Sequence, residues 1–263
     1  LKGLVLFFSI VFFMLIAYSI SNNFFEPKAF NFMVKNFTAV KTGSSDIVII
    51  VIDDKSIGKY RWPWKRNLYC KVFNYLNEYA KPKVIVNDSI FATPDTENPK
   101  SDLEYFNSIR KINNLVVGFD FLPNKTKVNN NNYDYKFYKK FGLDIKDDRN
   151  FGQEHSYQTL LAFPEPYFNS IKMVGSVKSP VSRDSFLRSI PYVVCYKDKL
   201  YPSLSLRAFS YINDNEGYIV SDSNIYGKKS HIVIPRTNDF YGVHTLLKFY
   251  KRYNNTNYTH KTY

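Results

Sequence analysis

The sequence predicts an α/β fold in which a mostly parallel sheet is flanked by helices and extended by antiparallel strands, preceded by one N-terminal transmembrane helix. Three observations predict it: an uncharged apolar run near the N-terminus, three strand-then-helix repeats over the next seventy-odd residues, and a second half dominated by strands. Alternating strands and helices imply parallel strands joined by right-handed crossovers. The 263 residues are enough to bury a sizeable core.

The N-terminal segment is predicted to be a membrane anchor. The run from Leu4 to Ile20 has seventeen residues and no charge, so as a helix it would span roughly 25 Å. A cleaved signal peptide is the alternative, but the run exceeds a usual apolar signal core and no small-residue cleavage site follows it. We therefore expect an anchor over residues 1–25 and a juxtamembrane stalk over 26–45. The stalk carries apolar residues at helical spacing, namely Phe30, Met33, Val34 and Phe37.

Residues 46–263 are predicted to form the domain that follows the stalk. Its first strand, Ile47–Ile52, consists of β-branched residues and could be buried on both faces of a sheet. A helix over Lys65–Ala80 follows, and Ser101 and Glu104 are spaced as a capping box for a second helix that ends near Ile112. The other two strands of the repeats are Lys83–Asn87 and Leu115–Phe119.

The pattern changes in the second half of the chain. Residues 122–150 include a four-Asn tract and show no clear amphipathic face, so we expect an insertion or a long loop there. One helix is expected to start at Pro202, because proline is well tolerated in a first helical turn. The remaining predicted strands are Met173–Val177, Ile190–Tyr196, Gly217–Val220 and His231–Ile234.

Composition excludes several classes of protein. The formal charge of +13 and the 18% aromatic content suggest nucleic-acid binding, but Lys, Asn, Tyr and Phe are abundant everywhere, so we expect no nucleic-acid partner. Cys70 and Cys195 exclude a disulfide framework and a thiolate zinc site, and we expect two unpaired thiols. The four histidines show no ligand spacing. We expect no cofactor, and the sequence leaves open whether a metal binds.

Carboxylates follow the three predicted strands of the repeats. Asp53 and Asp54 follow the first strand, Asp88 the second and Asp120 the third. Ligands of open parallel sheets bind beyond the carboxyl ends of the strands, so these side chains could hold a divalent cation or accept hydrogen bonds from a polar ligand. Asp also commonly stabilises the turn after a strand, which is the alternative interpretation.

An aromatic and basic cluster follows at residues 61–66. Trp62, Trp64 and Arg66 could bind an anionic or aromatic ligand. Alternatively, Pro63 fixes the entry to the helix while the two indoles pack over the sheet edge. The candidate ligand-binding residues are Asp53, Asp54, Asp88, Arg66, Trp62 and Trp64. No nucleophile elbow, phosphate-binding glycine loop or metal-binding His pair occurs, so no catalytic residue is expected.

Several motifs in order resemble the CHASE2 family of extracytoplasmic sensor domains of bacterial receptors. They cover most of residues 46–206. Ser185 replaces a usual glycine, and the Asn-rich insertion is not typical of the family. The matching positions are Asp53, Asp54 and Ser56; Trp62, Pro63, Trp64 and Arg66; Lys83, Val84, Ile85, Asp88 and Phe91; Pro94 and Asp95; Asp184, Arg188 and Pro191; and Tyr201, Pro202, Ser203 and Leu204.

The resemblance implies a function in signal transduction. It implies a sensor domain that faces the periplasm or the cell exterior, is tethered to the membrane, and responds to an unknown small-molecule ligand by shifting a conformational equilibrium. A homodimer is left open as a further partner. It also implies further membrane helices and a cyclase or kinase output module in a full-length parent. The alternative function is that of a membrane-tethered, metal-dependent hydrolase that uses the strand-end carboxylates.

Overall fold

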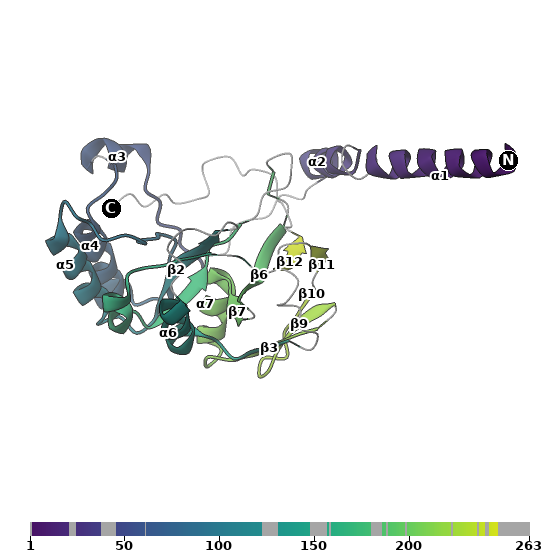
Figure 1. Cartoon of the computed structure of the whole chain (residues 1–263). Coiled ribbons are helices and arrows are strands. Elements are labelled where there is room, and N and C mark those ends of the chain that lie inside the picture. The colour runs from purple at the N-terminus through teal and green to yellow at the C-terminus, as the bar shows by residue number, and fades with distance from the viewer. Residues whose placement is uncertain are drawn as a thin grey trace. The chain divides into compact units, whose positions relative to one another are not determined.

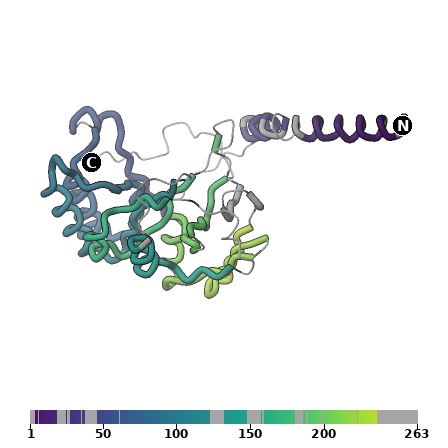
Figure 2. The backbone as a smooth tube through the Cα atoms, in the orientation of Figure 1, coloured from purple at the N-terminus to yellow at the C-terminus, as the bar shows by residue number. Residues whose placement is uncertain are grey.

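The structure is a computed structural model, and its backbone can be followed in Figures 1 and 2. The residues it describes are 2–20, 25–37, 46–60, 62–122, 131–147, 157, 159–179, 186–187, 189–197, 199–221, 223–235, 237–239 and 242–246. The chain divides into two compact units, which we describe separately. The first unit comprises residues 1–60 and 248–263, and the second comprises residues 61–247.

In the part of the first unit that the structure describes there are three α-helices: α1 (Lys2–Ile20), α2 (Glu26–Phe37) and α3 (Asp54–Tyr60). The helical spacing predicted in residues 26–45 is confirmed by α2, while the role of this segment as a stalk stays a prediction. The apolar run near the N-terminus is also helical, and its large apolar side chains are exposed. Within the described residues, however, no helix is both long enough and apolar enough to cross a membrane. The predicted transmembrane helix is therefore not confirmed.

The predicted first strand is wrong. Residues 47–52 form no regular secondary structure, and the side chains of Ile47–Val51 are 42–71% exposed. β-Branched composition makes a segment compatible with a strand, but a strand also needs a neighbour to pair its backbone amides and carbonyls. No strand pairing of these residues is found in the described part of the chain.

The second unit contains four α-helices within its described residues. The predicted helix over 65–80 is confirmed as α4 (Arg66–Tyr75) followed by a π-helical turn, η2 (Leu76–Ala80). The other three are α5 (Pro99–Ile109), α6 (Asn131–Phe141) and α7 (Leu204–Ile212), and a 3-10 helix, η4, covers Glu165–Ser170. Helices α4 and α5 pack against each other, as Figure 1 shows, and η4 contacts both α5 and α6.

Within the described residues the strands form two mixed sheets and one antiparallel sheet, so the expectation of a mostly parallel sheet is wrong. The first sheet has the order β1-β2-β4 with β5 on β2, the second β10-β9-β8-β3 and the third β11-β12-β6-β7. Parallel pairs are β1 with β2, β2 with β5 and β3 with β8, and the other pairs are antiparallel. The strands are β1 (Ile85–Asn87), β2 (Leu115–Leu122), β3 (Ile145–Asp147), β4 (Thr159–Leu161), β5 (Met173–Ser176), β6 (Ser189–Tyr196), β7 (Lys199–Pro202), β8 (Tyr218–Val220), β9 (Asn224–Gly227), β10 (Val233–Pro235), β11 (Thr237–Asp239) and β12 (Gly242–Leu246).

Helices cover both faces of the first sheet. Alternate residues of a strand point to opposite faces, and Val116 of β2 packs with Met173 of β5 and Ala208 of α7. The approach of α7 is close: a Cβ atom added at Gly175 would lie 2.4 Å from the Cα of Leu204. On the other face, Phe119 meets Phe137 of α6 with ring centroids 5.1 Å apart. The sheet is therefore sandwiched between α7 and α6.

The predicted capping box is wrong, because α5 starts earlier than expected. Asn98 is the N-cap residue and Pro99 occupies the first helical turn. The Ser101 hydroxyl instead accepts a hydrogen bond from the Asn67 amide at 3.0 Å, and the Glu104 carboxylate accepts one from the Asn67 side chain at 3.0 Å. Both side chains thus join α5 to α4 rather than capping α5.

Of the two alternatives expected for residues 122–150, an insertion or a long loop, the long loop is wrong where α6 and β3 form. Residues 123–130 and 148–150 lie outside the described residues, but α6 and β3 form between them. Phe137 and Phe141 of α6 lie four residues apart and are both buried, so they form the buried face of this helix. The sequence does not reveal this face, because other aromatic residues, partly buried or exposed, lie between and beside the buried ones. Neither Cys70 nor Cys195 forms a disulfide bond within the described residues.

Candidate functional site

Polar side chains gather at the carboxyl edge of the first sheet. Strands β1, β2 and β5 are parallel, with Asn87 beside Val117 and Phe119 beside Ser176, so all three run toward the same edge. Asp88 follows β1 directly. Asp120 lies near the end of β2, and Lys178 lies two residues after β5. We refer to Asp88, Asp120 and Lys178 as the strand-end cluster.

Gly118 brings these strand ends close together. A Cβ atom at this position would lie 2.8 Å from a methyl group of Val177, 3.1 Å from the carbonyl oxygen of Asn87 and 3.6 Å from the Cα of Asp88. A larger residue would therefore push apart the segments that carry the strand-end cluster. The absence of a side chain here is what lets the ends of β1 and β5 converge over β2.

The turn after β1 does not depend on Asp88. The Asn87 side chain accepts a hydrogen bond from the Ser89 amide at 3.2 Å and donates one to the Tyr105 hydroxyl at 3.2 Å. Asp88 is exposed as a residue, although protein atoms surround part of its carboxylate, and no hydrogen bond or ion pair of this group is found within the described residues. Partial burial, and secondly the negative charge of Asp120, raise the pKa of Asp88 above its usual range.

Lys178 partly balances the charge of the two carboxylates. Its ammonium group lies 3.7 Å from the Asp120 carboxylate and donates a hydrogen bond to the Phe121 carbonyl at 2.7 Å. The same group lies 5.2 Å from the centre of the Tyr157 ring, which stacks on Phe121. Lys178 is thus fixed beside Asp120, and Asp88 carries the exposed carboxylate of the cluster.

Asp53 and Asp54 belong to the first unit and do not follow a strand. Asp53 precedes α3, where its carboxylate accepts a hydrogen bond from the Ser56 amide at 2.8 Å and its carbonyl oxygen one from the Ile57 amide at 2.9 Å. Hydrogen bonds from Ser56 lower the pKa of Asp53. For Asp53, the alternative interpretation as a capping residue is therefore the one observed. Asp54 is exposed in the first turn of α3.

Arg66 is buried and forms an ion pair. Its guanidinium group lies 2.5 Å from the Asp102 carboxylate, which also accepts a hydrogen bond from the Asp95 amide at 2.8 Å. Arg66 also donates to the Thr93 carbonyl oxygen and lies over the ring of Phe91, 4.7 Å from its centre. These contacts fix the loop between β1 and α5 against the start of α4.

The two tryptophans differ in their surroundings. Trp62 is 57% exposed, and the Trp62–Pro63 peptide bond is cis. Trp64 is partly buried, and its ring packs edge-on against the ring of Tyr69 with the centroids 5.9 Å apart. The ring of Tyr69 contacts that of Phe91 in the same way, with the centroids 5.3 Å apart. The structural interpretation therefore fits Trp64, while Trp62 keeps an exposed indole.

Sequence reasoning missed Lys178, Tyr157 and Asp102. Lys178 follows the predicted strand Met173–Val177 directly, so the strand-end rule that selected Asp88 could have found it. Asp102 lies 36 positions from Arg66 in the chain, and no local pattern links the two. No group of three or more His, Cys, Asp or Glu side chains that could hold a metal ion is found among the described residues.

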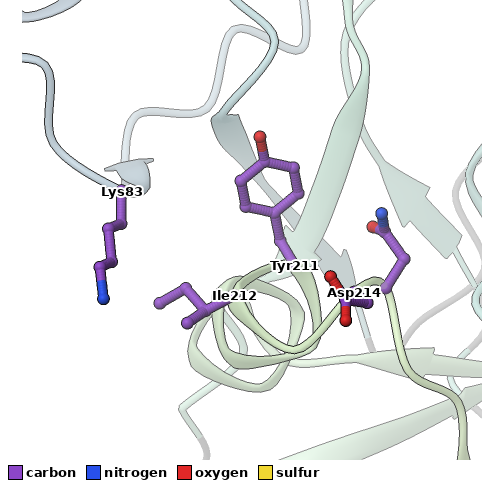
Figure 3. A pocket seen from close by; sticks show the side chains of 5 residues that line it. Lys83, Tyr211, Ile212 and Asp214 are labelled. Carbon is purple, nitrogen blue, oxygen red and sulfur yellow. The ribbon is translucent and has the colours of Figure 1, made fainter.

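A shallow hollow lies at the opposite, amino end of β1. Figure 3 shows it between Lys83, which precedes β1, and the end of α7, where the Ile212 side chain extends toward the lysine. The remaining lining residues are Tyr211, Asp214 and Asn215. Since β1 separates Lys83 from Asp88, this hollow is distinct from the strand-end cluster.

We expect Asp88→Asn to stabilise the domain slightly at neutral pH. A raised pKa means that the ionised carboxylate is disfavoured in the folded state. This penalty is present above the raised pKa and disappears as the pH falls below the ordinary pKa of Asp, so the gain should vanish in acid. Because Asp88 is exposed, solvent screening should keep the gain below about 1 kcal/mol.

Urea unfolding of the Asp88→Asn variant and of the unmodified chain, at neutral and at acidic pH, measures the difference in their stabilities. Glu97→Gln, which removes another exposed carboxylate, is the control. A loss of stability for Asp88→Asn at neutral pH would contradict the prediction, because it would mean that the ionised carboxylate makes a stabilising contact.

The fold and its strand-end cluster place the chain among mixed α/β domains with polar groups at the carboxyl edge of parallel strands, an arrangement typical of ligand-binding domains. The chain belongs to the CHASE2 family, because the model of the CHASE2 domain matches residues 5–263. This match confirms the family that the sequence motifs predicted. CHASE2 domains are extracytoplasmic sensor domains of signal-transduction receptors. No curated protein and no solved structure matches the chain significantly.

Proposed function

We propose that the chain is the membrane-anchored, ligand-binding sensor part of a bacterial receptor, facing the periplasm or the cell exterior. In this role it binds a ligand and carries out no catalysis. The observation that carries the proposal is the exposed carboxylate of Asp88, which the turn after β1 does not use and which lies on the same edge as Asp120. Membership of the CHASE2 family supports the sensory role.

The composition and exposure of α1 support the membrane anchor. A helix that is apolar on all sides is stable only inside a protein core or a bilayer, and the side chains of α1 are exposed. Its 19 described residues extend over about 28 Å, which is less than the ~30 Å of a hydrocarbon core, in keeping with the finding that no described helix is both long enough and apolar enough to cross a membrane. The Ser9 hydroxyl donates to the Val5 carbonyl at 2.9 Å, so this polar group does not depend on water.

The proposed recognition surface comprises the strand-end cluster and the exposed indole of Trp62. Two carboxylates and one fixed ammonium group leave a net negative charge, which favours a ligand with a cationic group or several hydrogen-bond donors. Of the residues that the sequence suggested, Asp88 and Trp62 keep this role in the proposal. Asp53, Arg66 and Trp64 instead make the local contacts described above.

Thermal unfolding of the full chain in detergent micelles tests this surface, with calcium, magnesium, manganese and putrescine as probes. We expect at least one probe to raise Tm, because a ligand that binds only the folded state adds about 2.7 kcal/mol at a hundred times its Kd. The combined Asp88→Asn and Asp120→Asn variant should lose this response, whereas Glu97→Gln should keep it. If no probe raises Tm, or if the double variant responds like the unmodified chain, the proposed surface is wrong.

A further inference from the structure

Helix α2 presents an exposed aromatic stripe. Phe25, immediately before the helix, and Phe32, Met33 and Phe37 within it are 54–75% exposed. At 100° per residue these four positions fall within an arc of roughly 140°, so they form one side of the helix. We call them the α2 stripe. Phe32 and Phe37 also contact each other, with ring centroids 6.1 Å apart.

The other side of α2 is less exposed and mixed in character, because Phe30 and Val34 are partly buried there together with Asn31. Asn31 lies roughly opposite the α2 stripe, and Lys28 lies at its border. Asn36 falls inside the arc of the stripe, but its side-chain amide donates to the Phe32 carbonyl oxygen at 2.8 Å. That bond partly satisfies the amide within the helix, which lowers the cost of placing Asn36 in an apolar environment.

We propose that the α2 stripe lies in the headgroup region of a phospholipid bilayer, with α2 parallel to the membrane surface. The 12 residues of α2 extend over about 18 Å, too short to cross a hydrocarbon core of ~30 Å. An amphipathic helix with aromatic residues on one side and Lys at its border is typical of helices that lie in the interface.

Two further observations favour lipid over a protein partner. The proposed anchor α1 precedes α2 in the chain and would hold it within reach of the bilayer surface. Moreover, 21 of the 31 large apolar side chains that are exposed in the described residues belong to the first unit, in which no described residue is buried. A segment without a core of its own, tethered at a bilayer, gains most by burying its apolar side chains there. This inference rests on the proposed membrane anchor.

The test uses spin labels on the full chain in vesicles of phosphatidylcholine and phosphatidylglycerol. Single cysteines at Phe32→Cys and, as the matched control, Asn31→Cys are labelled in a Cys70→Ser background, because Cys195 is fully buried and should not react. We expect a several-fold higher ratio of oxygen to water-soluble nickel accessibility at position 32 than at position 31, since oxygen concentrates in lipid.

Flotation of the same vesicles separates the two proposals. If the chain does not float with the vesicles, the membrane anchor is wrong and the inference on α2 fails with it. If the chain floats but positions 31 and 32 are equally accessible to nickel, only the α2 inference is overturned. Shielding of position 32 from both oxygen and nickel would also overturn it, because that pattern indicates a protein contact.

Discussion

Replacing Asp102 by alanine is expected to cost about 3–5 kcal/mol of unfolding free energy, the range for breaking a buried ion pair by removing one partner. The variant leaves the guanidinium group of Arg66 buried without its carboxylate, and the amide of Asp95 loses its acceptor as well. Both partners are at most 10% exposed at their side chains, so water cannot replace the lost contacts readily. Urea unfolding of the full chain measures the difference.

Two further variants make this prediction specific. Glu165→Ala breaks an ion pair with Lys136 in which the Glu165 side chain is 41% exposed and the Lys136 side chain 46% exposed. Because the pair is exposed, this variant should change stability by no more than about 1 kcal/mol. The double variant Arg66→Met with Asp102→Leu should be less destabilised than Asp102→Ala, since it buries no unpaired charge. A cost below about 1 kcal/mol for Asp102→Ala would show that this pair does not hold the loop in place.

Local patterns in the sequence correctly predicted those elements that depend only on residues close together in the chain. The helix over 65–80, strand β2 and the family motifs were all readable from spacing and composition. Asp88 was found as well, because the position after a strand is a local property. These features need no knowledge of distant parts of the chain.

Long-range partners decided the rest. Residues 47–52 have the composition of a strand, but only a neighbouring strand could make them one, and the described residues provide none. The ion pair of Arg66 could not be predicted, because Asp102 lies in another helix. Asp53 does not lie at a strand end, because residues 47–52 form no strand.

Phe137→Ala is expected to cost about 3–5 kcal/mol of unfolding free energy, the range for truncating a buried aromatic residue. Phe137 is fully buried, and its ring centroid lies 5.0–6.1 Å from those of five aromatic neighbours: Phe119, Phe141, Phe163, Phe168 and Tyr201. The alanine variant would leave a cavity between α6 and β2 that these large rings cannot easily fill. The segment that the sequence presents as an insertion is thus expected to be essential for stability.

Tyr135→Ala is the matched control, because it truncates an aromatic residue of the same helix that is 64% exposed. Both changes alter helix propensity in the same direction, so the difference between them reports packing. We expect Tyr135→Ala to remain within about 0.5 kcal/mol of the unmodified chain in urea unfolding. Equal stabilities of the two variants would mean that α6 is not part of the core, and that the Asn-rich segment is an insertion after all. A large difference would instead place the core of this CHASE2 domain partly in the segment around 122–150, because Phe137 packs directly on Phe119 of the strand that carries Asp120.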